Sequence, residues 1–251
     1  IGASTREAQA GVATDVANGV AQVLRGEPVA TAVNASPITK ATLHVIQPYF
    51  DLCERIGHIG IDLAGGRING VTVEYTGELA ETETAPLTTA VLKGLLAPIL
   101  QQTVNFVNAR GIAEERNIEI KETKTKRGQY FTNTVTVTIE TDKGNHRVTG
   151  TLFDRKEAKI VALDNFRVDL EPKGCFILAP HENKPGMIGQ MAGILGKAGV
   201  NINGMQVGAS KDKNTNIMAV AIDKDIPSAI LPVLANIDGI HGITVIHCES
   251  H

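Results

Sequence analysis

The C-terminal part of the chain alternates short apolar runs with one amphipathic stretch, a pattern that predicts strands flanking a helix. Apolar residues 176–178 lead into a polar turn at His181–Gly186. The positions that follow recur at spacings of three and four, which gives one apolar helix face. These positions are Ile188, Met191, Ala192 and Leu195. We expect Pro185 to be the first helical residue, because its missing N–H has no intrahelical partner there, and Gly199 to end the helix.

The residues after this helix complete a repeated strand and helix order. Val200 and Ile202 alternate, and the phase of alternation changes at Gly204, which predicts a bulge. Residues 217–222 are continuously apolar, as in a central strand covered on both faces. We expect a second helix from Pro227, kinked at Pro232, and a last strand at 243–246. The βαββαβ order predicts a ferredoxin-like antiparallel sheet with two helices on one face.

Residues 35–172 predict a separate α+β unit. Apolar periodicity indicates a helix from 48 to 63 and a strand at 71–75, and a helical block covers 86–108 with a break at Pro98. A short helix at 110–117 and a meander of strands through 170 follow. The polar segment 171–174 is the clearest boundary in the sequence, so we divide the chain into 1–34, 35–172 and 173–251.

The first 34 residues predict a single long helix and its exit. Ser4 and Glu7 match a capping box, and Gly26 and Pro28 end the helical pattern. The apolar stripe of this helix needs a surface to pack on. Because Ile1 is also no initiator residue, we expect the chain to be a piece of a longer protein.

Composition excludes several classes of partner. The net charge of −3 and the isoelectric point near 6.2 give no reason to expect nucleic acid or an anionic membrane. No window reaches the ~20 apolar residues of a membrane span. The three cysteines are scattered without a paired motif, so we expect reduced thiols, a cytoplasmic setting and no metal site. They are Cys53, Cys175 and Cys248.

The turn before the C-terminal helix carries the candidate chemistry. His181 and Asn183 precede Gly186, and free N–H groups at a helix N-terminus attract a carboxylate. We expect Asn201 to point a second amide at the same place, which would make a pocket for a small zwitterion such as an amino acid. The alternative is a structural histidine and an asparagine that serves only as an N-cap.

With these residues in view, positions 173–251 resemble an ACT domain. The His181–Gly186 turn with 199–201 resembles the effector site of the D-3-phosphoglycerate dehydrogenase family. The resemblance implies that His181, Asn183 and Asn201 hold L-serine across a dimer interface, with the carboxylate at Gly186. It also implies self-association through ACT domains.

The resemblance extends over nearly the whole chain. Residues 1–5 resemble the Gly-Ala-Ser-Thr segment that follows the catalytic histidine of this family, and 75–79, 106–109 and 150–152 resemble its intervening, anion-binding domain. The resemblance implies a parent enzyme that uses NAD to oxidise 3-phosphoglycerate, the first step of the phosphorylated route to serine. The catalytic residues and the nucleotide-binding glycine loop are absent, so this chain alone should hold no cofactor and transfer no hydride.

The resemblance also implies a phosphate-like anion site in the middle unit. Lys159 matches one basic position of the family, but Glu171 stands where the family has an arginine. Arg167 or Lys173 could substitute, and their alternative role is that of solvated surface charges.

Two other interpretations remain open. The ACT-like unit could dimerise without any effector, as a purely structural module. The chain could also be a fragment of an L-serine dehydratase, although the scattered cysteines do not form an iron–sulfur ligand set and the Gly-Ala-Ser-Thr opening counts against it.

Overall fold

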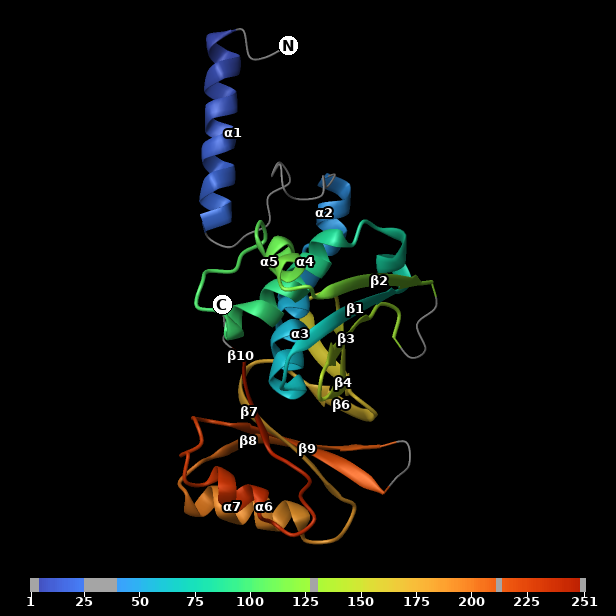
Figure 1. The fold of residues 1–251 in the computed structure, drawn as a ribbon, viewed down its shortest axis with the longest axis vertical. Coiled ribbons are helices and arrows are strands. Elements are labelled where there is room, and N and C mark those ends of the chain that lie inside the picture. Colours follow the sequence, from blue (N-terminus) through green and yellow to red (C-terminus); the bar gives the residue numbers. More distant parts are fainter. Residues whose placement is uncertain (1–4, 25–39, 127–130, 211–213, 249–251) are drawn as a thin grey trace.

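The computed structural model describes residues 5–24, 40–126, 131–210 and 214–248 (Figure 1). The elements up to the end of the first sheet are α1 (Arg6–Leu24), α2 (Lys40–Ile46), α3 (Tyr49–Ala64), β1 (Ile68–Thr76), η1 (Gly77–Glu81), α4 (Ala85–Leu96), η2 (Ala97–Ile99), α5 (Ala109–Glu115), β2 (Glu119–Thr125), β3 (Val135–Thr141), β4 (Gly144–Phe153), β5 (Glu157–Leu163) and β6 (Phe166–Leu170). The remaining elements are β7 (Gly174–Glu182), α6 (Met187–Lys197), β8 (Ile202–Ala209), β9 (Thr215–Ile222), α7 (Leu231–Ala235) and β10 (Thr244–Cys248). The expected α+β class is confirmed, with a leading helix, a six-stranded sheet and a four-stranded sheet.

Helix α3 lies at the centre of the main hydrophobic core. Its buried face carries Leu52, Ile56 and Ile59, which are fully buried. One side packs on β3 and β4, where Gly150 leaves room for the Leu52 and Ile56 side chains. Another side packs on α4, and the helix also contacts β10 of the second sheet. The two sheets therefore share one core through α3.

The first sheet has the strand order β2-β1-β3-β4-β5-β6. The meander from β3 to β6 is antiparallel, as the alternating pattern predicts. The expectation that β2 belongs to this meander is wrong, since β2 pairs with β1 in parallel at the sheet edge. The helical block expected to reach residue 108 ends at Ile99, because Pro98 cannot continue the helical hydrogen-bond ladder and no further helix forms before α5.

The second sheet is antiparallel with the order β10-β7-β9-β8 (Figure 1). Strand β9 is central, and its residues alternate between the two cores as expected for a strand covered on both faces. Ile217 and Ala219 face the α3 core, whereas Met218 and Val220 face α6 and α7. The register of β8 on β9 shifts between Ile202 and Gly204, which confirms the predicted bulge.

Both helices of this unit begin later than the prolines suggest. Gly186, with φ of 90°, is the N-cap of α6, so Pro185 precedes the helix. Helix α7 begins at Leu231, and Pro232 lies in its first turn instead of kinking its middle. A proline in the first turn costs no hydrogen bond, which explains why it is tolerated there.

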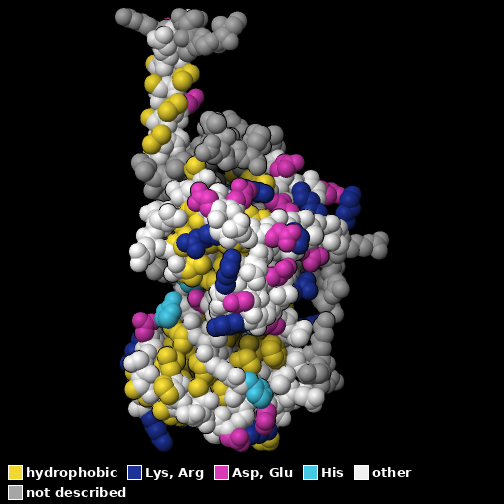
Figure 2. Space-filling model, in the orientation of Figure 1, with side chains coloured by type: hydrophobic (Ala, Val, Ile, Leu, Met, Phe, Trp, Pro, Cys, Tyr) yellow, Lys and Arg dark blue, Asp and Glu magenta, His cyan; other side chains and the backbone are white. Residues whose placement is uncertain are grey.

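Helix α1 carries an apolar stripe that the described residues leave exposed. Val12, Val16 and Val20 are each more than half exposed, and Figure 2 shows apolar side chains along the helix. The Thr5 hydroxyl accepts a hydrogen bond from the Ala8 N–H, while Ser4, Gly26 and Pro28 lie outside the described residues. No helix in the described part of the chain is long and apolar enough to span a membrane.

Candidate functional site: an amide and imidazole cluster at the start of helix α6

The turn before α6 presents an uncapped helix N-terminus. Gly186 adopts a left-handed conformation, and no side chain in the described part of the chain caps the first turn of α6. The interpretation of Asn183 as a plain N-cap is therefore wrong. The turn is held in place by the neighbouring segment, since the Lys184 ammonium lies 2.7 Å from the Asp238 carboxylate and 3.1 Å from that of Glu182. The hydrogen bonds to Asp238 and Glu182 raise the pKa of Lys184.

His181 is buried at the end of β7, with 3% of its surface exposed. Its Nδ1 lies 2.7 Å from the Glu182 carbonyl oxygen, which can only accept, so Nδ1 is the donor. In the neutral ring Nε2 is then an acceptor, and it is buried without a partner among the described residues. An unsatisfied buried acceptor is costly, so this atom is suited to receive a ligand hydroxyl or ammonium.

Asn216 joins this cluster and was missed by sequence reasoning. It is the register partner of His181 across β7 and β9, and its Nδ2 donates to the Asn183 Oδ1 at 3.0 Å. Its own Oδ1 is buried without a partner among the described residues. The signal in the sequence was a polar residue at the start of an otherwise apolar strand. His181, Asn183 and Asn216 thus form an amide and imidazole cluster.

Asn201 lies at the other end of the sheet, so the expectation that it points at the same place within one chain is wrong. Its N–H donates to the Asp223 carboxylate at 2.9 Å, and its side-chain amide donates to Asn203 at 3.3 Å. The neighbouring Ile202 pairs with Ile222 of β9, whereas His181 pairs with Asn216. Along β9, six residues separate Asn216 from Ile222. This distance is about 20 Å, which is too far for one amino acid to bridge.

Two copies of the chain can bring these residues together. Strand β8 is the last strand of this sheet, but β6 lies along the C-terminal half of its outer edge, through the isolated bridge between Phe166 and Ser210 and a hydrogen bond from the Asp169 N–H to the Gln206 side-chain oxygen. A second copy that displaced β6 and paired β8 with β8 in antiparallel register, Ile202 opposite Ala209, would bring the Asn201 end of one chain to the Ala209 end of the other. Ala209 lies in the same row as Asn216 and His181.

The basic residues expected to hold an anion are paired with carboxylates. Lys159 lies 3.5 Å from Glu157 and 3.6 Å from Asp169, and the Lys173 ammonium forms an ion pair with Glu171 at 2.5 Å. Hydrogen bonding to Lys173 is the main reason why the pKa of Glu171 is lowered, and the charges of Lys159 and Arg55 add to it.

Arg167 and Arg55 lie in different places relative to Lys159, Lys173 and Glu171. Arg167 pairs in register with Ala162 on the adjacent strand, and no described contact joins it to Glu171. Arg55 is a buried cation that sequence reasoning missed. It donates to the Pro172 carbonyl, between the two sheets, and to Asp51. A charged residue beside the apolar stripe of α3 was the signal that could have revealed it.

Comparison with known proteins identifies both units. Residues 45–164 match the D-3-phosphoglycerate dehydrogenase intervening domain, and residues 181–239 match the ACT domain. The chain is 37% identical to D-3-phosphoglycerate dehydrogenase from Synechocystis sp. over 96% of its own length and 44% of the relative. It is 36% identical to the enzyme from Methanocaldococcus jannaschii and 33% to that from Bacillus subtilis, in each case over 98% of the chain and 47% of the relative.

The fold and the matched units define an intervening domain followed by an ACT domain. Over nearly its whole length the chain is homologous to D-3-phosphoglycerate dehydrogenases. It spans somewhat less than half the length of the curated relatives it matches.

Proposed function

We propose that this chain is the regulatory region of an NAD-dependent D-3-phosphoglycerate dehydrogenase and binds L-serine between two ACT domains. Residues 1–34 would be the terminal helix of the catalytic region, 35–172 the intervening domain and 173–251 the ACT domain. The exposed valines of α1 fit packing against a part of the enzyme that this chain does not span. The catalytic and NAD-binding residues would belong to that part.

The unpaired buried acceptors of the amide and imidazole cluster carry this proposal. The serine hydroxyl would donate to the His181 Nε2, and its carboxylate would accept from the free N–H groups of α6 beyond Gly186. The ammonium would donate to the Asn201 amide oxygen of the second copy. A ligand that bridges two subunits favours the arrangement in which both halves of the site meet, which is how it would regulate the enzyme.

A thermal melting experiment tests serine binding. L-serine at about 100 times its dissociation constant adds ~2.7 kcal/mol of stability, which should raise Tm by about 5 °C or more. D-serine and L-alanine are matched controls, because one inverts the ammonium position and the other lacks the hydroxyl. No shift with L-serine at millimolar concentration would favour the purely structural dimer.

The match of 45–164 to the dehydrogenase intervening domain favours this family over an L-serine dehydratase.

Phosphate binding beside the junction of the two domains is a second candidate function. Lys173, Lys159 and Arg55 all act on the single carboxylate of Glu171. A phosphate or a phosphorylated substrate-like anion would compete with that carboxylate for the same charges.

The variant Glu171→Gln tests the phosphate site. Removal of the competing carboxylate should raise phosphate affinity by up to about fivefold, the range expected for one exposed ion pair. Isothermal titration of the two proteins with inorganic phosphate measures the change. Glu157→Gln should raise phosphate affinity less than Glu171→Gln, because this carboxylate lies 3.5 Å from Lys159. Equal or weaker phosphate binding by Glu171→Gln would contradict the assignment.

A further inference from the structure

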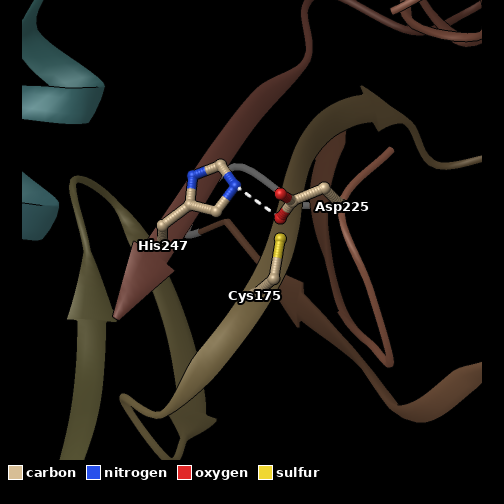
Figure 3. Close-up of side chains that lie close together, drawn as sticks. All are labelled: Cys175, Asp225 and His247. Atoms are coloured by element: carbon tan, nitrogen blue, oxygen red, sulfur yellow. Dashed lines mark hydrogen bonds and ion pairs between the residues drawn. The ribbon is translucent and has the colours of Figure 1, made fainter. Parts of the chain in front are cut away.

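Three side chains of different metal-binding types meet at the β10 side of the ACT sheet, away from the amide and imidazole cluster (Figure 3). Cys175 is on β7 and His247 is its direct partner on β10. Asp225 belongs to the segment just after β9, whose last residue Ile222 pairs with Cys175. Three adjacent strands thus bring together residues that are far apart in sequence, which is why no sequence motif indicated them.

The three groups are close enough to share one ion. The Cys175 Sγ, an Asp225 carboxylate oxygen and a His247 ring nitrogen all lie within 4.8 Å of one another. His247 Nε2 is 3.1 Å from Asp225 Oδ1 (Figure 3). Ligand atoms around a tetrahedral zinc ion are about 3–4 Å apart, given metal–ligand bonds of about 2.0–2.3 Å. Small side-chain rotations would therefore close the site, and two of the three side chains are exposed enough to make them.

The donor set decides the class of ion. Sulfur with nitrogen favours borderline transition ions such as zinc, while calcium and magnesium require oxygen donors. Three protein ligands leave the fourth tetrahedral position for water or another small ligand. We propose that Cys175, Asp225 and His247 form a binding site for a zinc-type divalent ion.

Binding requires the release of one proton. Partial burial, with a smaller contribution from the Asp225 charge, raises the pKa of the Cys175 thiol, so the thiol is protonated without metal. The ion takes the place of that proton and forms the metal–sulfur bond, while the proton leaves to solvent. The hydrogen that His247 Nε2 shares with Asp225 moves to Nδ1, so Nε2 becomes a ligand.

The position of the site at the joint of the two domains gives it a structural consequence. Cys175 is the second residue of β7, directly after the segment whose Pro172 carbonyl accepts from Arg55 of α3. Asp62 of α3 lies near enough to His247 to interact with it electrostatically. The His58 Nε2 lies 3.5 Å from the Asp62 carboxylate. An ion bound here would tie β7, β10 and the segment after β9 together, so it should raise the melting temperature of the chain.

Cobalt substitution tests the site directly. The chain is freed of metal with a chelator and titrated with Co²⁺, followed by displacement with Zn²⁺. We expect one equivalent of Co²⁺ to produce a near-ultraviolet thiolate-to-cobalt absorption band that Zn²⁺ abolishes. Cys175→Ser should abolish the band, and His247→Ala should weaken binding by about tenfold or more, since even second-shell changes cost 10–100-fold.

His146→Gln is the matched control. His146 Nδ1 lies 3.1 Å from Asp164 Oδ2, a histidine–carboxylate pair of comparable length without a thiol, so its loss should leave the band and the affinity unchanged. Circular dichroism checks that each variant is folded, and the exposed His247 keeps the test decisive should Cys175→Ser misfold. Absence of the thiolate band, or a band that survives Cys175→Ser, would overturn the proposal.

Discussion

A mixed dimer of one Asn183→Ala chain and one Asn201→Ala chain is expected to bind serine with wild-type affinity at one of its two sites. Each homodimeric variant should bind about tenfold to hundredfold more weakly at both sites. Asn201→Ala removes the proposed hydrogen bond to the serine ammonium, worth ~1.5–3 kcal/mol, and Asn183→Ala removes the amide that holds Asn216 in the proposed pocket. Titration calorimetry of affinity-tagged mixed dimers measures both the affinity and the number of sites.

The expected half-recovery follows from the geometry of the ACT sheet. Asn183 is bonded to Asn216 at one end of β9, and Asn201 is bonded to Asp223 beyond the other end. One chain does not bring the two residues together, so the proposed site would combine Asn183 of one copy with Asn201 of the other. In the mixed dimer one site receives both intact residues and the second receives neither.

Two outcomes would contradict this arrangement. Mixed dimers with no recovered site would mean that the two amides act within one chain or do not bind serine at all. Wild-type affinity in either homodimeric variant would remove that residue from the site. Asn145→Ala is a suitable control, because it deletes an exposed amide on β4 of the first sheet. Both test residues are also exposed, so the folded state should survive their loss.

The strands of the ACT unit could be predicted because their side chains pack alternately into two hydrophobic cores, one on each face of the sheet. Residues 217–222 are buried alternately against α3 and against α6, so every position is apolar and the strand is visible as a short apolar run. The bulge at Gly204 likewise left a visible phase change. The parallel pairing of β2 with β1 left no local trace, because its partner is set by the connection through α4 and α5 and not by the strand's own residues.

The residues proposed for the effector site could be named from the sequence, but their relative positions could not. Helix α6 runs antiparallel to β7 for 11 residues, or about 16 Å, so it carries the chain from the His181 end of the sheet to the other end. Asn201 follows this helix and therefore opens β8 far from Asn183. The pairing of Asn216 with His181, the burial of Arg55 and the metal-binding group depend on contacts between distant segments, which no spacing along the chain encodes.

Gly94→Ala is expected to destabilise the chain by about 3 kcal/mol, although alanine is normally the better helix former by about 1 kcal/mol. Helices α3 and α4 cross in close backbone contact. A Cβ at Gly94 would lie 1.9 Å from the Glu54 carbonyl oxygen, and one at Gly57 would lie 2.2 Å from that of Val91. Backbone atoms cannot rotate away as a side chain would, so the two helices must separate. Their separation loosens the hydrophobic core around α3.

Urea denaturation followed by circular dichroism measures the effect, since the chain has no tryptophan. Gly111→Ala in α5 is the matched control, because its Cβ would meet nothing within 4 Å and stability should hold or rise slightly. The double variant Gly57→Ala/Gly94→Ala should cost less than the sum of the single variants, since the first separation of the helices makes room for the second Cβ. Additive costs would instead mean that each glycine fits its own independent contact, and unchanged stability in Gly94→Ala would contradict the close crossing itself.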